Sequence, residues 1–266
     1  MINEKVEVAI IGGTGVYETG ALKDAKQIKV YTPYGAPADL ITVGTYAGKK
    51  TAFLPRHGGN HHIPPHNIPF RANIWALKQL GVKRIIAPCA VGSLCEELPP
   101  GHIVFPDQFF DFTKNRDYSF YDGGQVCHIG VAEPFCKELR SLVINVAKDM
   151  KIDFQDYGTA VCIEGPRYST KAESNFFKNA VQAHIIGMTL VPECVLAREA
   201  EICYLPIAAV TDYDVWADEP VDTDSVKKTM AKNVDTIRKL IVNLLPKISE
   251  ERKICECHDA LDGAMI

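Results

Sequence analysis

The stretch YLPIAAVTDYD, residues 204–214, joins an apolar run to two carboxylates. The run over residues 204–210 indicates a buried strand, and Asp212 and Asp214 follow it directly. These acids therefore stand where a parallel strand would end, which is the edge at which open α/β sheets bind their ligands. A solvated turn is the alternative interpretation of the two acids.

Strands and helices alternate along the rest of the chain. Apolar runs bounded by turn residues predict strands at residues 6–11, 83–93 and 158–165, and a hairpin around the Ala47-Gly48 turn. Apolar residues at helical spacing predict helices within 67–82, 133–150, 190–201 and 224–245. This alternation predicts one α/β domain with a central mixed β-sheet flanked by helices over residues 1–248, followed by a C-terminal arm or tail over 249–266.

The composition argues against several classes of protein. Over 266 residues, 29 Lys and Arg stand against 33 Asp and Glu with no basic block, so neither a nucleic-acid partner nor a membrane partner is expected. No stretch reaches the roughly 18 apolar residues of a membrane helix, and the first residues lack the apolar core of a signal peptide. We therefore expect a cytoplasmic protein.

Nine cysteines are many for this length, and most lie in apolar runs that indicate small core residues. No Cys-x-x-Cys pair and no repeated zinc spacing occurs, so no metal site is expected. Cys255 and Cys257 form a Cys-Glu-Cys motif in the polar tail, where we expect exposed side chains. A labile disulfide between them and two free thiols are both open, because a ring of this size is strained.

Three segments carry groups that bind anions. The Gly-Gly-Thr-Gly turn after the first strand can form a nest of backbone N–H groups, with the Thr14 hydroxyl as a further donor. Arg56 and His57 follow the hairpin, and such a pair suits phosphate because a guanidinium binds phosphate oxygens bidentately. Met188 and Thr189 stand at the head of an expected helix, where N–H groups favour an anion.

A metal site is the alternative for the histidine-rich segment after the hairpin. Four histidines fall within ten residues there, namely His57, His61, His62 and His66. Neither a His-Glu-x-x-His motif nor suitably spaced carboxylates accompany them, and Pro64 and Pro65 exclude a helical face. We therefore interpret the segment as part of an anion site.

Ten motifs occur in a fixed order along the chain: GGTG, PRHG, RANIWALKQLG, AVGSL, PDQFFDFT, SFYDG, AEPFC, IEGPRYST, MTLVPE and TDYDVW. Together they closely resemble the trimeric purine nucleoside phosphorylase family over residues 6–245, and within it they look most like the 5′-methylthioadenosine phosphorylases. The resemblance implies a single α/β domain that cleaves a purine nucleoside with inorganic phosphate. It also implies no metal or organic cofactor and a homotrimer or homohexamer.

The resemblance assigns roles to the residues that match the family motifs. Phosphate is expected to be bound by Thr14, Arg56, His57, Cys89, Ala90 and Thr189. The nucleoside is expected to contact Tyr168, Ser169, Met188, Asp212, Asp214, Val221, Thr223, Val226 and, from a neighbouring subunit, His128. Asp212 and His57 are the expected catalytic residues, with Asp212 as the general acid that assists departure of the base through N7.

The implied reaction is phosphorolysis of 5′-methylthioadenosine, and of related 6-aminopurine nucleosides, in purine and methionine salvage. An aspartate at the base edge favours a 6-amino group, because a 6-oxo group would set two acceptors against each other. The alternatives are a 6-oxopurine nucleoside phosphorylase, a nucleoside hydrolase and a non-catalytic nucleotide-binding protein. Two residues depart from the family pattern: Cys89 replaces a hydroxyl donor to phosphate, and Thr223 replaces a valine of the 5′ pocket.

Overall fold

Strand β5 (Arg84–Ser93) is the centre of the sheet, because β1, β10 and β11 all pair with it. The structure is a computed structural model that describes residues 5–13, 22–217, 223–249 and 251–266. The other strands are β1 (Val8–Gly12), β2 (Lys23–Ile28), β3 (Ile41–Tyr46), β4 (Lys49–Pro55), β6 (Ile103–Val104), β7 (Gln108–Phe112), β8 (Phe154–Gln155), β9 (Thr159–Ile163), β10 (Ile185–Gly187) and β11 (Cys203–Asp212). The α-helices are α1 (Phe70–Gln79), α2 (Lys137–Asp149), α3 (Lys171–Asn179), α4 (Glu193–Glu199) and α5 (Thr223–Leu244).

The strands form one mixed sheet of eleven strands over the described residues. Its main path runs β2-β3-β4-β1-β5-β10-β9-β7, and β11 pairs with both β5 and β6. Strands β1, β4, β5 and β11 are parallel along their shared pairings, whereas β3 and β4 form an antiparallel hairpin. Ala47 and Gly48 of that hairpin both have positive φ, 46° and 80°, as a tight two-residue turn requires. The predicted mixed sheet and hairpin are confirmed.

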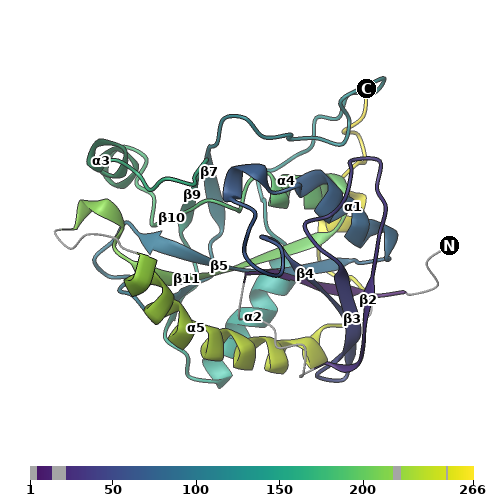
Figure 1. Cartoon of the computed structure of the whole chain (residues 1–266), viewed down its shortest axis with the longest axis horizontal. Coiled ribbons are helices and arrows are strands. Elements are labelled where there is room, and N and C mark those ends of the chain that lie inside the picture. Colours follow the sequence, from purple (N-terminus) through teal and green to yellow (C-terminus); the bar gives the residue numbers. More distant parts are fainter. Residues whose placement is uncertain (1–4, 14–21, 218–222, 250) are drawn as a thin grey trace.

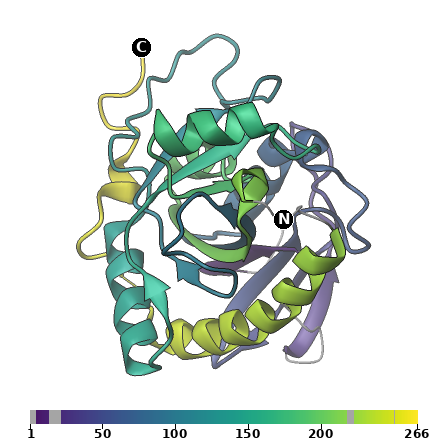
Figure 2. The same cartoon turned by 90° about the vertical axis from the view of Figure 1, so that its left-hand side faces the viewer.

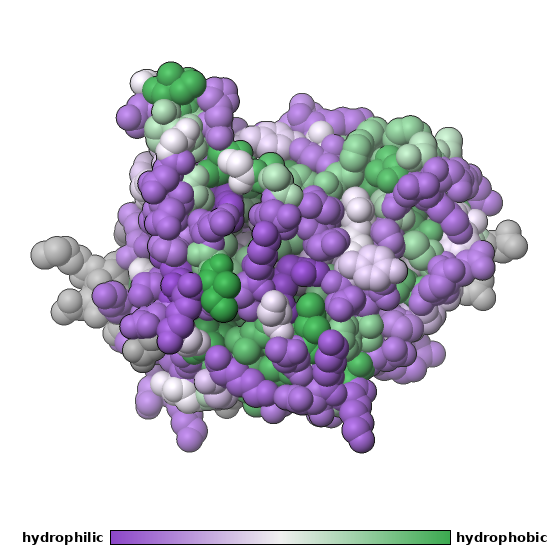
Figure 3. All heavy atoms as spheres, turned by 180° about the vertical axis from the view of Figure 1, so that it is seen from behind, coloured by the Kyte–Doolittle hydropathy of each residue, from purple (hydrophilic) through white to green (hydrophobic). Residues whose placement is uncertain are grey.

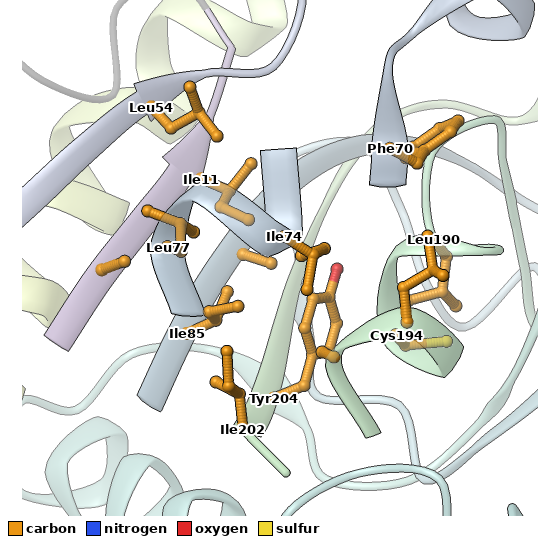
Figure 4. Close-up of a cluster of buried hydrophobic side chains, with 14 of the residues drawn as sticks. Ile11, Leu54, Phe70, Ile74, Leu77, Ile85, Leu190, Cys194, Ile202 and Tyr204 are labelled. Atoms are coloured by element: carbon orange, nitrogen blue, oxygen red, sulfur yellow. The ribbon is translucent and has the colours of Figure 1, made fainter. Parts of the chain in front are cut away.

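Helices cover both faces of the sheet (Figure 1). Helices α2 and α5 lie on one face of the sheet, and α1 and α4 lie on the other (Figure 1). The view turned by 90° shows α2 and α5 along the outside of the sheet (Figure 2). Neighbouring residues of one strand point to opposite faces, so Ile85 belongs to one core cluster and Ile86 to another. In the first cluster Ile74 and Leu77 of α1 pack near Ile85 and Tyr204 (Figure 4).

Two expectations from the sequence differ from the structure. The helix expected within 190–201 begins only at Glu193, after Pro192 at its N-cap, although its apolar run starts earlier. The side chains of Cys255 and Cys257 are buried, with 5% and 3% exposed, so the expectation of an exposed Cys-Glu-Cys motif was wrong. Across the described ranges, no helix has the length and apolar character needed to cross a membrane.

Candidate active site

The carboxyl ends of β1, β4, β5 and β11 meet at one edge of the sheet, because these strands run parallel. The Arg56 N–H, directly after β4, donates to the Gly12 carbonyl at 3.0 Å. Asp212, the last residue of β11, lies opposite Gly92 of β5. This edge therefore brings together the start of the glycine turn, the Arg-His pair and the acid pair.

Arg56 is buried, and its guanidinium already has protein partners. Its Nε and Nη2 atoms each lie 2.7 Å from a carboxylate oxygen of Glu193. Nη2 also donates to the Ile11 carbonyl and Nη1 to the Pro88 carbonyl, each at 3.3 Å. Because a guanidinium has five N–H donors, these four contacts leave one N–H on Nη1 without a partner in the described residues. The bidentate contact expected for phosphate is thus made with Glu193 instead.

Glu193 is a functional candidate that the sequence reading missed. Its side chain is fully buried, and Oε1 also accepts a hydrogen bond from the Tyr204 hydroxyl at 2.7 Å. Burial opposes the charge on Arg56, but Glu193 raises the pKa of Arg56 above its ordinary value. The sequence contained a signal for this role, because Glu193 lies inside the apolar run LVPECVLA. An acid in such a run is expected to be buried, and a buried acid is rarely without a charged or polar partner.

His57 lies beside Arg56 as a neutral imidazole. Its Nδ1 is 2.9 Å from the Ile63 carbonyl oxygen, so Nδ1–H donates there and Nε2 is left as an acceptor. Burial lowers the pKa of His57 to about 4, and its ring stacks on His61 with centroids 4.3 Å apart. A neutral imidazole whose Nε2 has no hydrogen-bond partner among the described residues can accept a hydrogen bond from a protonated phosphate oxygen.

Four of the predicted residues line one small cavity beside β5. The cavity measures about 20 Å³, and its lining includes Cys89, Ala90, Met188 and Thr189. Burial raises the pKa of Cys89 to about 11, so the group facing the cavity is a thiol and not a thiolate. Thr189 is buried but precedes α4 by several residues, so its expected place at a helix N-terminus was wrong.

A larger hollow lies elsewhere on the protein. It measures about 730 Å³ and is lined by residues around Leu94, Lys178 and His184. None of the predicted site residues is among its described lining residues. Size alone therefore does not identify the site, and the strand-end location with its converging polar groups carries the assignment.

Asp212 is held in place by its neighbours in the chain. Its Oδ2 accepts from the Thr211 hydroxyl at 2.7 Å, and its Oδ1 accepts from the Asp214 N–H at 2.9 Å. The second contact is an Asx turn, which fixes the direction of the carboxylate. Burial raises the pKa of Asp212 above its ordinary value, which favours a carboxyl that can take up or give a proton.

Asp214 is more deeply buried than its partner, with 4% of its surface exposed. Its Oδ2 accepts from the Ser174 hydroxyl at 2.5 Å, and burial raises the pKa of Asp214 as well. Its backbone has φ of 50°, in the left-handed region that few residues other than glycine adopt. A solvated turn was therefore the wrong interpretation for this acid.

Gly92 allows the acids to approach β5 closely. A Cβ atom at this position would lie 2.9 Å from Asp212 Oδ1 and 3.3 Å from Asp214 Cβ. The first distance is shorter than real Cβ contacts, so any larger residue would displace a carboxylate. Gly92 lies in the motif AVGSL, but the sequence motifs assigned it no role.

Tyr168 and Ser169 provide surfaces for a ligand. Tyr168 keeps 41% of its surface exposed, which leaves its ring available for stacking. The Ser169 hydroxyl is buried and has no hydrogen-bond partner among the described residues. Because an unpaired buried hydroxyl is costly, a bound molecule would supply the missing partner.

Other predicted residues are not brought together with this edge. His128 is exposed, and its N–H donates to the Ala264 carbonyl at 2.8 Å, so it is held by the C-terminal segment. Val226 lies partly buried near the start of α5. Thr14 and Val221 lie outside the described residues, and Thr223 begins α5 without a described side chain.

The family model of the phosphorylase superfamily matches residues 7–246 of this chain. The chain belongs to the phosphorylase superfamily. The predicted family is thereby confirmed. The strand-end edge is the part of an open α/β sheet at which ligands generally bind.

Relatives and solved structures are similar to this superfamily member over nearly its whole length. The S-methyl-5′-thioadenosine phosphorylase of Nitrosopumilus maritimus is 57% identical over 263 residues, covering 99% of both chains. That of Saccharolobus solfataricus is 52% identical over 266 residues, covering 99% of this chain and 98% of the relative.

Two solved structures share the fold. A methylthioadenosine phosphorylase from an antarctic soil metagenomic library has a TM-score of 0.93 and 42% identity, covering 99% of this chain and 93% of that one. The Schistosoma mansoni enzyme in complex with adenine has a TM-score of 0.90 and 37% identity, covering 98% and 97%. The predicted fold class, a single α/β domain with a mixed central sheet, is confirmed.

Proposed function

We propose that this protein cleaves 5′-methylthioadenosine with inorganic phosphate, releasing adenine and 5-methylthioribose 1-phosphate. The acid pair at the end of β11, half-buried Asp212 and buried Asp214, is the observation that carries the proposal. Relatives named S-methyl-5′-thioadenosine phosphorylase, 57% and 52% identical over nearly the full length, support the same reaction. Phosphate acts as co-substrate, and the reaction needs no organic cofactor.

The acid pair supports a 6-aminopurine as the base. Adenine presents an amino donor at position 6 next to the acceptor N7. The Asp212 carboxylate can accept from the amino group, and its protonated form, which burial favours by raising the pKa of Asp212, can donate to N7. A 6-oxo base would face acceptor oxygens instead, which is a costly mismatch in a buried site.

Cleavage moves an electron pair from the glycosidic bond onto the base, while a phosphate oxygen forms a new bond to C1′ of the ribose. Positive charge develops on the ribose in the transition state, and phosphate held beside it stabilises that charge. Asp212 assists departure by supplying a proton to N7. Met188 lines the small cavity beside β5, and in this proposal it packs against the ribose.

In this proposal phosphate is bound by hydrogen bonds from the protein and not by a positive charge without a counter-ion. The charge of Arg56 is matched by Glu193, so one Nη1 N–H remains for an anion oxygen. The neutral His57 can accept a hydrogen bond from a protonated phosphate oxygen through Nε2. Ala90 and Thr189, which line the adjoining cavity, are the further phosphate-binding residues of the proposal.

A homo-oligomer, either a trimer or a hexamer, is part of the proposal. Phe110, Phe112 and Phe176 are 40%, 36% and 48% exposed and lie in ring contact around the edge strand β7. Seen from behind, apolar side chains gather at the upper right, on the side of the molecule that carries α3 and β7 (Figure 3). Exposed apolar patches of this kind favour a protein interface. In the oligomer, the exposed His128 of one chain would complete the active site of a neighbouring chain. A cytoplasmic location remains a prediction.

A substrate panel with and without phosphate tests the proposal. We expect adenine release from 5′-methylthioadenosine that requires phosphate and consumes one phosphate for each adenine. Release at the same rate in phosphate-free buffer would identify a hydrolase. Preferential cleavage of inosine would identify a 6-oxopurine phosphorylase, and binding without cleavage of any nucleoside would contradict catalysis altogether.

A further inference from the structure

Four cysteines from three separate segments meet inside the protein. Their Sγ atoms all lie within 4.8 Å of one another, and we name this group the four-sulfur cluster: Cys136, Cys203, Cys255 and Cys257. Each of the four residues is buried, with 5% or less of its surface exposed. No part of the proposed reaction uses these side chains, so their meeting requires a separate explanation.

The first two members are fixed by the fold itself. Cys136 is the N-cap of α2, and its N–H donates to the Tyr204 carbonyl at 3.1 Å, directly beside Cys203. Cys203 is the first residue of β11 and lies opposite Arg84 of β5. These two sulfur atoms therefore sit on rigid elements, which is the support that a metal site needs.

The C-terminal segment delivers the other two members through specific contacts. Glu138, in the first turn of α2, accepts hydrogen bonds from the N–H groups of Lys253 at 3.0 Å and Ile254 at 3.1 Å. Arg84 Nη2 donates to the Glu251 carbonyl at 2.9 Å. The chain is thus held on the body just before Cys255, and the Cys-Glu-Cys motif turns its sulfur atoms inward.

The arrangement has the dimensions of a tetrahedral sulfur site. Zinc bound by four thiolates has Zn–S distances of about 2.3 Å, which places the sulfur atoms ~3.8 Å apart. The Cys203 and Cys255 sulfur atoms are 3.4 Å apart, and all pairs lie within 4.8 Å. We propose that the four-sulfur cluster binds one Zn²⁺ ion as a closed structural site that fastens the C-terminal segment to α2 and β11.

Charge at the cluster fits this proposal. Four thiols release four protons when they bind Zn²⁺, so the site carries a net charge of about −2. Arg198 Nη1 lies 3.5 Å from Cys257 Sγ and can donate to it. Arg84, buried and opposite Cys203, has Nε and Nη1 atoms without a partner in the described ranges. Two guanidinium groups are therefore placed at or beside the cluster to offset its negative charge.

Two disulfides are the competing use of the same four sulfur atoms. A bond between Cys255 and Cys257 would close a small, strained ring. Two separate bonds would also not require all four atoms to approach one another, whereas a tetrahedral ion does. The contact between Cys203 and Cys255 joins the strand to the tail directly, which is the linkage that a shared ion would make.

The site has a structural consequence beyond the cluster. The same C-terminal segment continues to Ala264, whose carbonyl accepts from His128, and to Ile266, whose N–H donates to the Val126 carbonyl at 3.0 Å. Fastening the segment at Cys255 and Cys257 therefore also holds residues 126–128 in place. This consequence follows whether or not the proposed reaction is correct.

Metal analysis of the full chain, purified with a reductant and without added metal, tests the proposal. We expect about one zinc per chain, and a cobalt-exchanged sample should show the absorption of tetrahedral Co²⁺ bound by four thiolates. Cys255→Ser should lower the zinc content at least about tenfold. The matched control Cys95→Ser, outside the cluster, should keep it. Removing zinc should speed amide exchange at residues 126–128 and 264–266.

Measurements on the wild-type protein can refute the proposal even if Cys255→Ser does not fold. Purified wild type that contains no zinc and takes up no cobalt would refute the site. Mass spectrometry that finds disulfides among these four cysteines in reductant-purified protein would likewise replace the metal with covalent bonds.

Discussion

The guanidinium of Arg56 and the carboxylate of Glu193 face each other through two hydrogen bonds of 2.7 Å, with both side chains buried. The pair joins the end of β4 to the first residue of α4. Because the two charges cancel, Arg56 offers the candidate phosphate site no unpaired positive charge. Its contribution to phosphate binding then depends on where its remaining Nη1 N–H points. Glu193 is thus a positioning residue for Arg56.

Glu193→Gln should impair both stability and phosphate use. Removing one partner of a buried ion pair leaves an uncompensated charge, so we expect the free energy of unfolding to fall by about 3 kcal/mol. The KM for phosphate should rise at least about tenfold, because Arg56 loses the partner that directs it. Denaturant unfolding and phosphate titration measure the two effects.

Asp235→Asn is the matched control for that change. Asp235 pairs with Lys239 at 2.6 Å on the surface of α5, where both side chains are about two-thirds exposed. Surface pairs contribute little, so neither stability nor the phosphate KM should change measurably. Equal effects of the two substitutions would show that the Arg56–Glu193 pair has no special role.

Gly92→Ala should damage the acid pair without unfolding the protein. The added Cβ would lie 2.9 Å from Asp212 Oδ1, so the carboxylate must move. We expect kcat/KM for the nucleoside to fall at least about tenfold, since small displacements of a catalytic group are costly. Gly123→Ala, where nothing lies within 4 Å of the new Cβ, is the control and should retain full activity. Unchanged kinetics of Gly92→Ala would remove Asp212 from the site.

Cys89→Thr should strengthen phosphate binding. The Cys89 side chain is half-buried, and its Sγ makes a long contact of 3.9 Å to the Ile207 carbonyl oxygen. A thiol is a weak donor, whereas a hydroxyl in the same place can donate fully to a phosphate oxygen. We expect the phosphate KM to fall several-fold, and Cys89→Ala should leave it unchanged. A rise in KM for Cys89→Thr would place phosphate elsewhere.

Acid should destabilise the protein partly through His57. Its pKa falls from the ordinary 6.5 to about 4 in the folded state, so between these values the unfolded chain binds the extra proton. The contribution is present above pH 6.5 and is lost as pH falls to about 4, amounting to about 3 kcal/mol. The difference in unfolding free energy between wild type and His57→Asn should therefore shrink over that range. A difference independent of pH would show that His57 is not held neutral.

Local patterns in the sequence could predict much of this molecule. The apolar run before Asp212 and the hairpin before Arg56 each lie within one segment, so the strand ends and their polar residues were predictable. Contacts between segments that are distant in the sequence could not be predicted in this way. Glu193 meets Arg56 across 137 residues, and the four-sulfur cluster draws on α2, β11 and the tail, so no sequence spacing reveals it. The start of α4 was misplaced because its apolar run extends before Pro192.

The specificity ratio between 5′-methylthioadenosine and inosine, measured as kcat/KM with saturating phosphate for wild type and Asp212→Asn, tests the central claim most directly. We predict that wild type prefers 5′-methylthioadenosine by at least about 100-fold, because a buried polar site rejects a mismatched base. In Asp212→Asn the ratio should shift strongly toward inosine, since an amide can donate to both N7 and a 6-oxo group. A wild-type enzyme that prefers inosine would contradict the account.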